Sequence, residues 1–138
     1  MFASLYTSFM PGVDDFDALE NLQYHFPAGT SIQVASHLSQ IRISGRFSFM
    51  DYGPEENLNL YGAEDVVEYP LQDIQVPIAI FAAEYDNVVL PENIEWLANQ
   101  LDTIVEVDWY PYSHTSPTIG LEGLHLNDLL RIIDEYSQ

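Results

Sequence analysis

The sequence predicts an α/β protein built on a parallel sheet, and three observations carry that prediction. Residues 76–83 form an apolar run bounded by a turn, the pattern of a strand buried on both faces of a parallel sheet. A helical pattern opens at Pro91, and a second strand pattern follows at 103–110. Because strands and helices alternate in this way, we expect ligands and catalytic groups at the carboxyl ends of the strands.

The composition indicates one acidic globular domain, or a piece of one. The 138 residues are 47% hydrophobic, which argues against disorder. They include 22 acids, three arginines and no lysine, for a formal net charge of −19. Such a field repels phosphate backbones and offers anionic membranes no basic patch, so nucleic acid is not an expected partner. The acids are spread along the chain, which favours a solvated acidic surface over the alternative of an acidic working compartment.

Neither a metal nor a cofactor is expected. The chain has no cysteine, which excludes disulfides, a thiol nucleophile and cysteine-based metal sites. His37 has Ile41 at i+4 where a second ligand would stand, so we interpret it as a packing histidine. Residues 1–10 lack a basic region and a small-residue cleavage site, so no signal peptide is predicted. No apolar run approaches the roughly 20 residues of a membrane span.

Two helices are predicted in the first third. Asp14, Asp15 and Asp17 fall in the first turn of the first helix, where acids suit the helix dipole. Thr30 or Ser31 then caps a second helix that runs to about residue 43 and stops at Gly45. The expected apolar stripes are Phe16, Leu19 and Leu22 in the first helix and Val34, Leu38 and Ile41 in the second.

The middle of the chain, 46–75, is less regular. Phe47 and Phe49 alternate with polar residues as a short extended piece, and Gly53-Pro54 predicts a turn. Leu58-Asn59-Leu60 alternates again, which we interpret as extended chain before a loop that reaches Asp73.

The last third predicts strand, helix, strand and helix. The first helix runs from Pro91 to about residue 101 with acids in its opening turns. In the second strand Glu106 and Asp108 point away from the apolar face, so we expect a half-exposed sheet edge. A final helix is predicted from the i, i+3, i+4, i+7 spacing of Leu126, Leu129, Leu130 and Ile133.

Two residues at the strand ends are candidates for catalysis. Asp86 follows the first strand, and His114 follows the second. This is the order in which α/β hydrolases end, where the chain carries Ser, then Asp or Glu, then His. In that arrangement the His takes a proton from the serine, and the carboxylate fixes the imidazole. The alternatives are that Asp86 orients the turn before Pro91 and that His114 is a loop histidine.

A series of short segments resembles, in order, the C-terminal third of the acid lipases, the gastric and lysosomal triacylglycerol and steryl-ester lipases. The match covers nearly the whole chain. The series is more specific than any one segment: Pro27-Ala28-Gly29-Thr30-Ser31-Ile32-Gln33, His37-Leu38-Ser39-Gln40, Ser44-Gly45-Arg46-Phe47, Asp51-Tyr52-Gly53, Val76-Pro77-Ile78-Ala79 with Asp86, and Tyr112-Ser113-His114.

The resemblance implies an architecture and two roles. It implies the last two parallel strands of an α/β-hydrolase fold with flanking helices, not a complete sheet. Residues 1–53 would be the end of the cap region and its return helix, and 54–138 the C-terminal part of the core. Asp86 would be the triad acid and His114 the triad base, with the cap covering an apolar acyl pocket. It also implies a secreted or lysosomal location.

The chain departs from the family pattern at both loops. Ala83-Glu84-Tyr85 stands where the family usually has glycines before the acid, and Glu84 would add like charge to the site. Thr115-Ser116-Pro117 follows the histidine in place of Asp and aromatic residues.

No G-x-S-x-G occurs in this sequence. Ser31 is interpreted as a helix cap, and Ser113 and Ser116 flank the histidine without a strand-to-helix elbow. We therefore expect the nucleophile, the oxyanion-hole donors and the first six strands outside this chain, and the isolated chain to be inactive.

Two functions remain open. The first is the C-terminal part of a lipase-type carboxylic ester hydrolase, with a lipid ester substrate once an N-terminal part completes it. The second is a non-catalytic, lipase-derived binding or structural subunit whose acidic surface faces a basic partner. In either, the strand at 76–83 would have an edge without a neighbour. A complementary chain or segment would pair with that edge, or local pieces such as 46–60 would cover it.

Overall fold

The computed structural model describes residues 9–25 and 29–137. The described residues form two compact units, one made of 9–25 with 72–137 and the other of 29–71. The first unit carries both candidate residues, Asp86 and His114. The sequence-based boundary at residue 53 is not tested by this division and stays a prediction.

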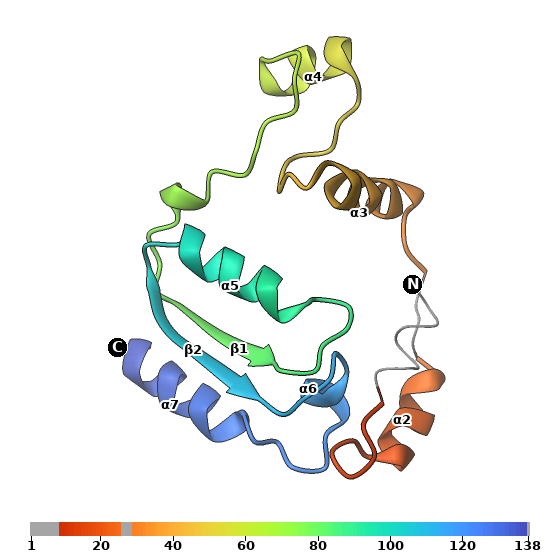
Figure 1. Ribbon diagram of the computed structural model, residues 1–138, viewed down its shortest axis with the longest axis vertical. Coiled ribbons are helices and arrows are strands. Elements are labelled where there is room, and N and C mark those ends of the chain that lie inside the picture. The colour runs from red at the N-terminus through yellow and green to blue at the C-terminus, as the bar shows by residue number, and fades with distance from the viewer. Residues whose placement is uncertain (1–8, 26–28, 138) are drawn as a thin grey trace. The chain divides into compact units, whose positions relative to one another are not determined.

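The first unit contains a pair of parallel strands, β1 (Ile78–Ala83) and β2 (Ile104–Tyr110) (Figure 1). Helix α5 (Pro91–Gln100) connects them, which confirms the α/β class. Residue 83 pairs with residue 110, so both strands end at the same level. In the described residues β1 pairs with β2 alone, and in β1 only Ala82 is buried. The expectation of a strand buried on both faces is therefore wrong, because within the part of the chain that the structure describes β1 has one neighbouring strand and is mostly half-buried.

Helix α5 and the final helix, α7 (Leu126–Tyr136), flank the two strands on opposite sides (Figure 1). The Glu106 face of β2 meets α7, because Arg131 of that helix bonds to Glu106. The Tyr110 hydroxyl donates to Asp128 of α7 at 2.7 Å. Glu106 and Asp108 are half-buried, as expected of a half-exposed strand, and side chains of α7 cover part of their face. The final helix is confirmed, and its face toward β2 was not part of the prediction.

The N-terminal segment lies beside the end of the short helix α6 (Ser116–Ile119). The amide of Asp15 donates to the Ile119 carbonyl at 2.7 Å, and that of Leu121 donates to the Val13 carbonyl at 2.8 Å. Asp15 also caps α2 (Phe16–Gln23), which confirms the first predicted helix. Asp14, expected in its first turn, is buried just before it, where its carboxylate accepts from the amide of Met10.

The second unit begins with α3 (Ile32–Ser44), whose predicted cap and stop are confirmed. The Ser31 hydroxyl accepts from the amide of Gln33 at 3.0 Å. Gly45 ends the helix at φ 67°, a left-handed conformation that glycine adopts without strain. Residues 47 and 49 are extended as expected, because the amide of Phe49 donates to Val67 and the Phe47 carbonyl accepts from Tyr69.

The interpretation of 58–60 as extended chain is wrong, because these residues lie in helix α4 (Pro54–Tyr61). Pro54 takes the first helical position, Glu55 and Glu56 fill the first turn, and Gly62 caps the end at φ 77°. These are strong start and stop signals, whereas three alternating residues fit one turn of helix as well as a strand. The following loop contains a short 3₁₀ helix, η1 (Leu71–Asp73).

Four of the five buried apolar side chains among the described residues gather at the carboxyl end of the strand pair, and Leu101, just before β2, lies at the other end. The five come from the ends of both strands, from the end of α5 and from the loop and short helix after β2. They are Ala82, Leu101, Tyr110, Tyr112 and Ile119. The most solidly packed part of the first unit therefore lies under the candidate residues.

Candidate active site

The carboxyl ends of β1 and β2 bring Asp86 and His114 together, as the strand order predicts. Nδ1 of His114 lies 2.9 Å from Oδ2 of Asp86. The Asp86 side chain is 11% exposed and that of His114 is 32% exposed. The carboxylate is thus largely sheltered, while part of the imidazole remains open to a reacting group.

The other oxygen of Asp86 is held by the backbone that follows it. Oδ1 accepts from the amides of Val88 at 2.8 Å and Val89 at 2.9 Å. Asp86 therefore does orient the turn before Pro91, which was the structural alternative for this residue. Since Oδ1 serves the turn and Oδ2 serves His114, one carboxylate fills both roles. Such a fixed carboxylate is what an imidazole needs to be held in one orientation.

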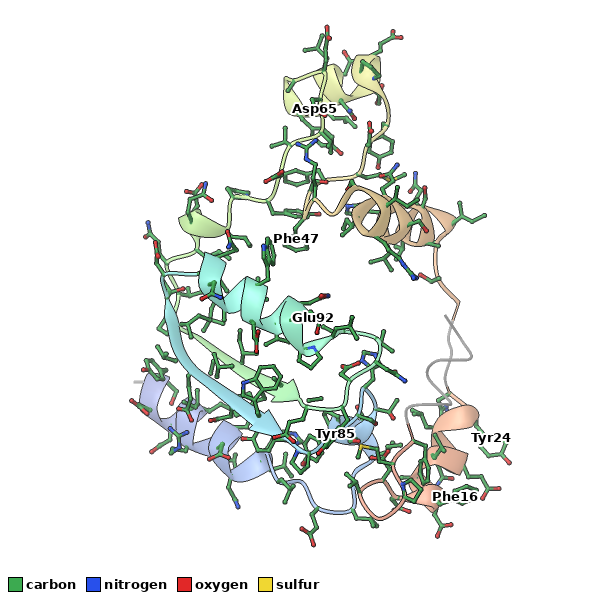
Figure 2. All side chains as sticks on the ribbon, viewed as in Figure 1. Phe16, Tyr24, Phe47, Asp65, Tyr85 and Glu92 are labelled. Carbon is green, nitrogen blue, oxygen red and sulfur yellow. The ribbon has the colours of Figure 1, made fainter. Side chains whose placement is uncertain are left out.

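The two loops that carry the pair are hydrogen-bonded to each other. The amide of Glu84 donates to the Tyr110 carbonyl, and that of Tyr85 donates to the Tyr112 carbonyl, both at 2.9 Å. The chain before Asp86 thus stays bonded to the segment at the end of β2, and it turns there without glycine, with the amide of Asp86 donating to the Ala83 carbonyl at 3.4 Å. Figure 2 shows Tyr85 just past the end of β1. The Glu84 side chain is exposed, so solvent screens its charge.

The loop of His114 rests on buried residues. Tyr112, Ser113 and Ser116 are each at most 2% exposed. The Tyr112 hydroxyl donates to the Glu122 carbonyl at 3.0 Å, and its ring stacks on Tyr110. The two serine hydroxyls lie 2.9 Å apart, and that of Ser116 accepts from the amide of Ser113.

Sequence reasoning weighed the two serines only as nucleophiles and missed their mutual bonds. A serine three residues after another is half of a capping-box spacing, and that spacing was the available signal. Because both hydroxyls are buried and bonded, neither faces a substrate. This agrees with the interpretation that neither Ser113 nor Ser116 is a nucleophile.

The arrangement can move a proton. With Nδ1 of His114 donating to Asp86, Nε2 on the opposite side of the ring can accept a proton from a hydroxyl. The carboxylate then stabilises the imidazolium that forms. Within 9–25 and 29–137, no group of three or more His, Asp or Glu side chains is placed to hold a metal ion.

The structure thus shows an α/β protein with a parallel strand pair, an acid after one strand and a histidine bonded to it after the next. No family model matches the chain. Comparison with curated proteins, however, finds lipases. The chain is 30% identical over 124 residues to lipase member N of Mus musculus, which covers 88% of this chain and 31% of that protein.

Two further relatives are similar. Gastric triacylglycerol lipase of Bos taurus is 35% identical over 92 residues, covering 65% of this chain and 23% of that lipase. Lipase member K of Homo sapiens is 29% identical over 118 residues, covering 83% of this chain and 30% of that protein. These matches confirm the resemblance: the curated relatives are gastric and lysosomal-type lipases, similar to this chain over part of its length.

The chain spans about a third or less of the length of these relatives. Among the helices of the described residues, none has both the length and the apolar character needed to cross a membrane.

Proposed function

We propose that this chain supplies the acid and the base of the catalytic triad of a lipase-type carboxylic ester hydrolase. Asp86 is the acid and His114 is the base. The observation that carries the proposal is the 2.9 Å bond between Nδ1 of His114 and Oδ2 of Asp86 at the ends of two adjacent parallel strands. The sequence relationship to lipases supports the same assignment.

In the proposed reaction a serine outside this chain is the nucleophile. His114 takes the proton of its hydroxyl as the serine oxygen attacks the ester carbonyl carbon. The tetrahedral intermediate collapses, the bond to the alcohol breaks, and His114 returns the proton to the leaving alcohol. A water molecule then repeats the sequence on the acyl-enzyme. Asp86 keeps its negative charge throughout and stabilises the imidazolium.

The proposed substrate is a lipid ester, either a triacylglycerol or a steryl ester. Relatives named as triacylglycerol lipases favour the first of these. The serine elbow, the oxyanion-hole donors and the remaining strands would belong to the part of the fold that this chain does not match. In this proposal the two strands are the C-terminal end of an α/β-hydrolase sheet, and the protein is secreted or lysosomal.

The complementary part would pair along β1. In the described residues the hydrogen bonds of β1 within the sheet run to β2, which leaves one edge of an apolar strand for a further neighbour. An apolar strand edge of this kind is prone to pair with another strand. We propose that the strand taken up there belongs to the part that carries the serine.

Complementation tests the proposal. The full chain is assayed on a short-chain aryl ester, alone and mixed with a fragment that carries a G-x-S-x-G elbow from a relative such as the bovine gastric lipase. We expect no hydrolysis by the chain alone and activity on mixing. His114→Ala should lower the activity of the mixture by at least ~10³-fold.

The matched control is His25→Ala, because His25 is an exposed histidine of the same unit. It should leave the activity of the mixture unchanged. A mixture as inert as the lone chain, with complex formation verified by gel filtration, would overturn the catalytic proposal. That result would favour the non-catalytic subunit with an acidic partner-binding surface.

A further inference from the structure

A pair of buried serines lies in the loop that carries His114. Ser113 is 1% exposed and Ser116 is 2% exposed, and the proposed reaction uses neither. Their hydroxyl oxygens are 2.9 Å apart. The Ser116 hydroxyl also accepts from the amide of Ser113 at 2.9 Å. Because a buried amide needs a partner, this second bond fixes the backbone just before His114.

The two serines close a turn that has His114 in its second position. The amide of Ser116 donates back to the Ser113 carbonyl at 3.3 Å, so the ends of the turn are bonded in both directions. His114 and Thr115 are the residues enclosed. Closing the turn limits the backbone of His114, and the direction of its side chain follows from that backbone.

Ser116 is itself held firmly. Its carbonyl accepts from the amide of Gly120 at 2.7 Å, and a Cβ at residue 120 would lie 2.7 Å from the same oxygen. The residues around Gly120 are hydrogen-bonded to the segment 13–15. The turn that contains His114 is therefore connected, through Gly120 and its neighbours, to the segment 13–15, which is distant in the sequence.

We infer that Ser116 is a positioning residue for His114: its hydroxyl holds the turn that brings Nδ1 within reach of Asp86. The catalytic meaning of this inference rests on the proposed function, whereas the positioning itself is a property of this chain alone. Sequence position 116 lies in the loop segment where the chain departs from the family pattern.

The test compares Ser116→Ala with Ser113→Ala in the full chain. Each removes one buried hydroxyl, but Ser113→Ala keeps the amide donor and its Ser116 acceptor. The readout is the low-field NMR resonance of the proton between His114 and Asp86, assigned by its loss in Asp86→Ala. We expect this proton to exchange with water at least ~10-fold faster in Ser116→Ala and less than ~2-fold faster in Ser113→Ala. Equal effects of the two variants, or no effect of Ser116→Ala, would overturn the inference.

If Ser116→Ala does not fold, a measurement on the unchanged chain tests the positioning role of Ser116. Amide hydrogen exchange is followed at Ser113, whose N–H is the group that the Ser116 hydroxyl binds. The inference expects this amide to be protected and to open at the same rate as the His114 proton. A Ser113 amide that exchanges as fast as an exposed loop amide would contradict it.

Enzyme kinetics separate this inference from the proposed function. In the complemented mixture Ser116→Ala should lower kcat by about 10- to 100-fold with little change in KM, because a misplaced base slows chemistry without altering substrate binding. A mixture that never hydrolyses ester, beside a clear NMR effect, would overturn the proposed function and leave the positioning role intact.

Discussion

At the residue scale, the two carboxylate oxygens of Asp86 have different partners. Oδ1 is held by the amides of Val88 and Val89, and Oδ2 faces Nδ1 of His114. The sequence predicts this pairing from strand order alone, because parallel neighbours end at the same edge. It does not predict the division between the two oxygens, since that depends on the turn conformation after the strand.

Asp86→Asn should therefore strongly lower kcat without removing the turn. The amide oxygen can still accept from Val88 and Val89, but the NH₂ group then faces Nδ1 of His114 and favours the tautomer with the proton on Nε2. An imidazole in that tautomer cannot accept the serine proton. We expect kcat of the complemented enzyme to fall by about 10³- to 10⁴-fold.

Glu84→Gln is the charge control for that variant. Glu84 is exposed two residues before Asp86, and water and salt screen its field. Steady-state kinetics should show less than a threefold change in kcat/KM. A fall as large as that of Asp86→Asn would show that the general charge of the loop, and not the bond to His114, supports the reaction.

At the scale of elements, periodicity and end signals predict most helices and both strands. Helix α4 was missed because the three-residue alternation at 58–60 was given more weight than Pro54, its following acids and Gly62. The face that α7 presents to β2 could not be predicted, for a different reason. Its polar side chains face β2 because Arg131 and Asp128 find partners on that strand, and such pairs between elements leave no mark in either element's own pattern.

The contact of β2 with α7 predicts a pH dependence of stability. The hydrogen bond that protonated Asp108 donates to Glu106, together with burial, raises the pKa of Asp108. The bond to Arg131 lowers the pKa of Glu106. Burial and the bond to Asp128 raise the pKa of the Tyr110 hydroxyl.

The signs of the two carboxyl contributions are opposite. Since the folded state favours protonated Asp108, its contribution is complete below the unfolded pKa and is lost as pH rises through its raised folded pKa. The Glu106 contribution is present above its unfolded pKa and is lost as pH falls through its lowered folded pKa.

Asp108→Asn should stabilise the chain at pH 7 and leave its stability near pH 3 almost unchanged. The amide replaces a carboxylate that Glu106 and Asp128 disfavour at neutral pH, whereas in acid the native side chain is already neutral. Urea unfolding between pH 3 and pH 7 measures the difference. The exposed Asp102→Asn is the control, and a pH profile for Asp108→Asn parallel to that control would contradict the account.

Gly120→Ala should destabilise the first unit. A Cβ at this position would meet the Ser116 carbonyl at 2.7 Å, and a backbone oxygen cannot move aside cheaply. Overpacking of this kind costs about 1–3 kcal/mol. Gly29→Ala is the matched control, because a Cβ there meets nothing within 4 Å. Chemical denaturation of both variants should show the loss for Gly120→Ala alone, and equal stabilities would mean that the backbone relaxes at 120.

At the scale of the whole molecule, a chain that spans about a third or less of the length of its lipase relatives carries both residues of the proposed acid–base pair. The relationship to lipases was visible in short ordered segments, such as those around Gly45 and Gly53. The bonds that anchor the segment after His114 were not, because they join residues 13 and 15 to residues 121 and 119. The order of the strands can be predicted from the periodicity of the sequence. Hydrogen bonds between segments that are distant in the sequence form only in the folded chain.

The most direct measurement asks whether this chain activates a serine that it does not contain. The serine-bearing fragment of a relative is treated with a fluorophosphonate probe, and the rate of covalent labelling is followed with and without this chain. The account predicts that the unchanged chain accelerates labelling at least ~10²-fold and that His114→Ala does not. Equal labelling rates with the unchanged chain and with His114→Ala would contradict the assignment of Asp86 and His114 as the acid and base of the triad.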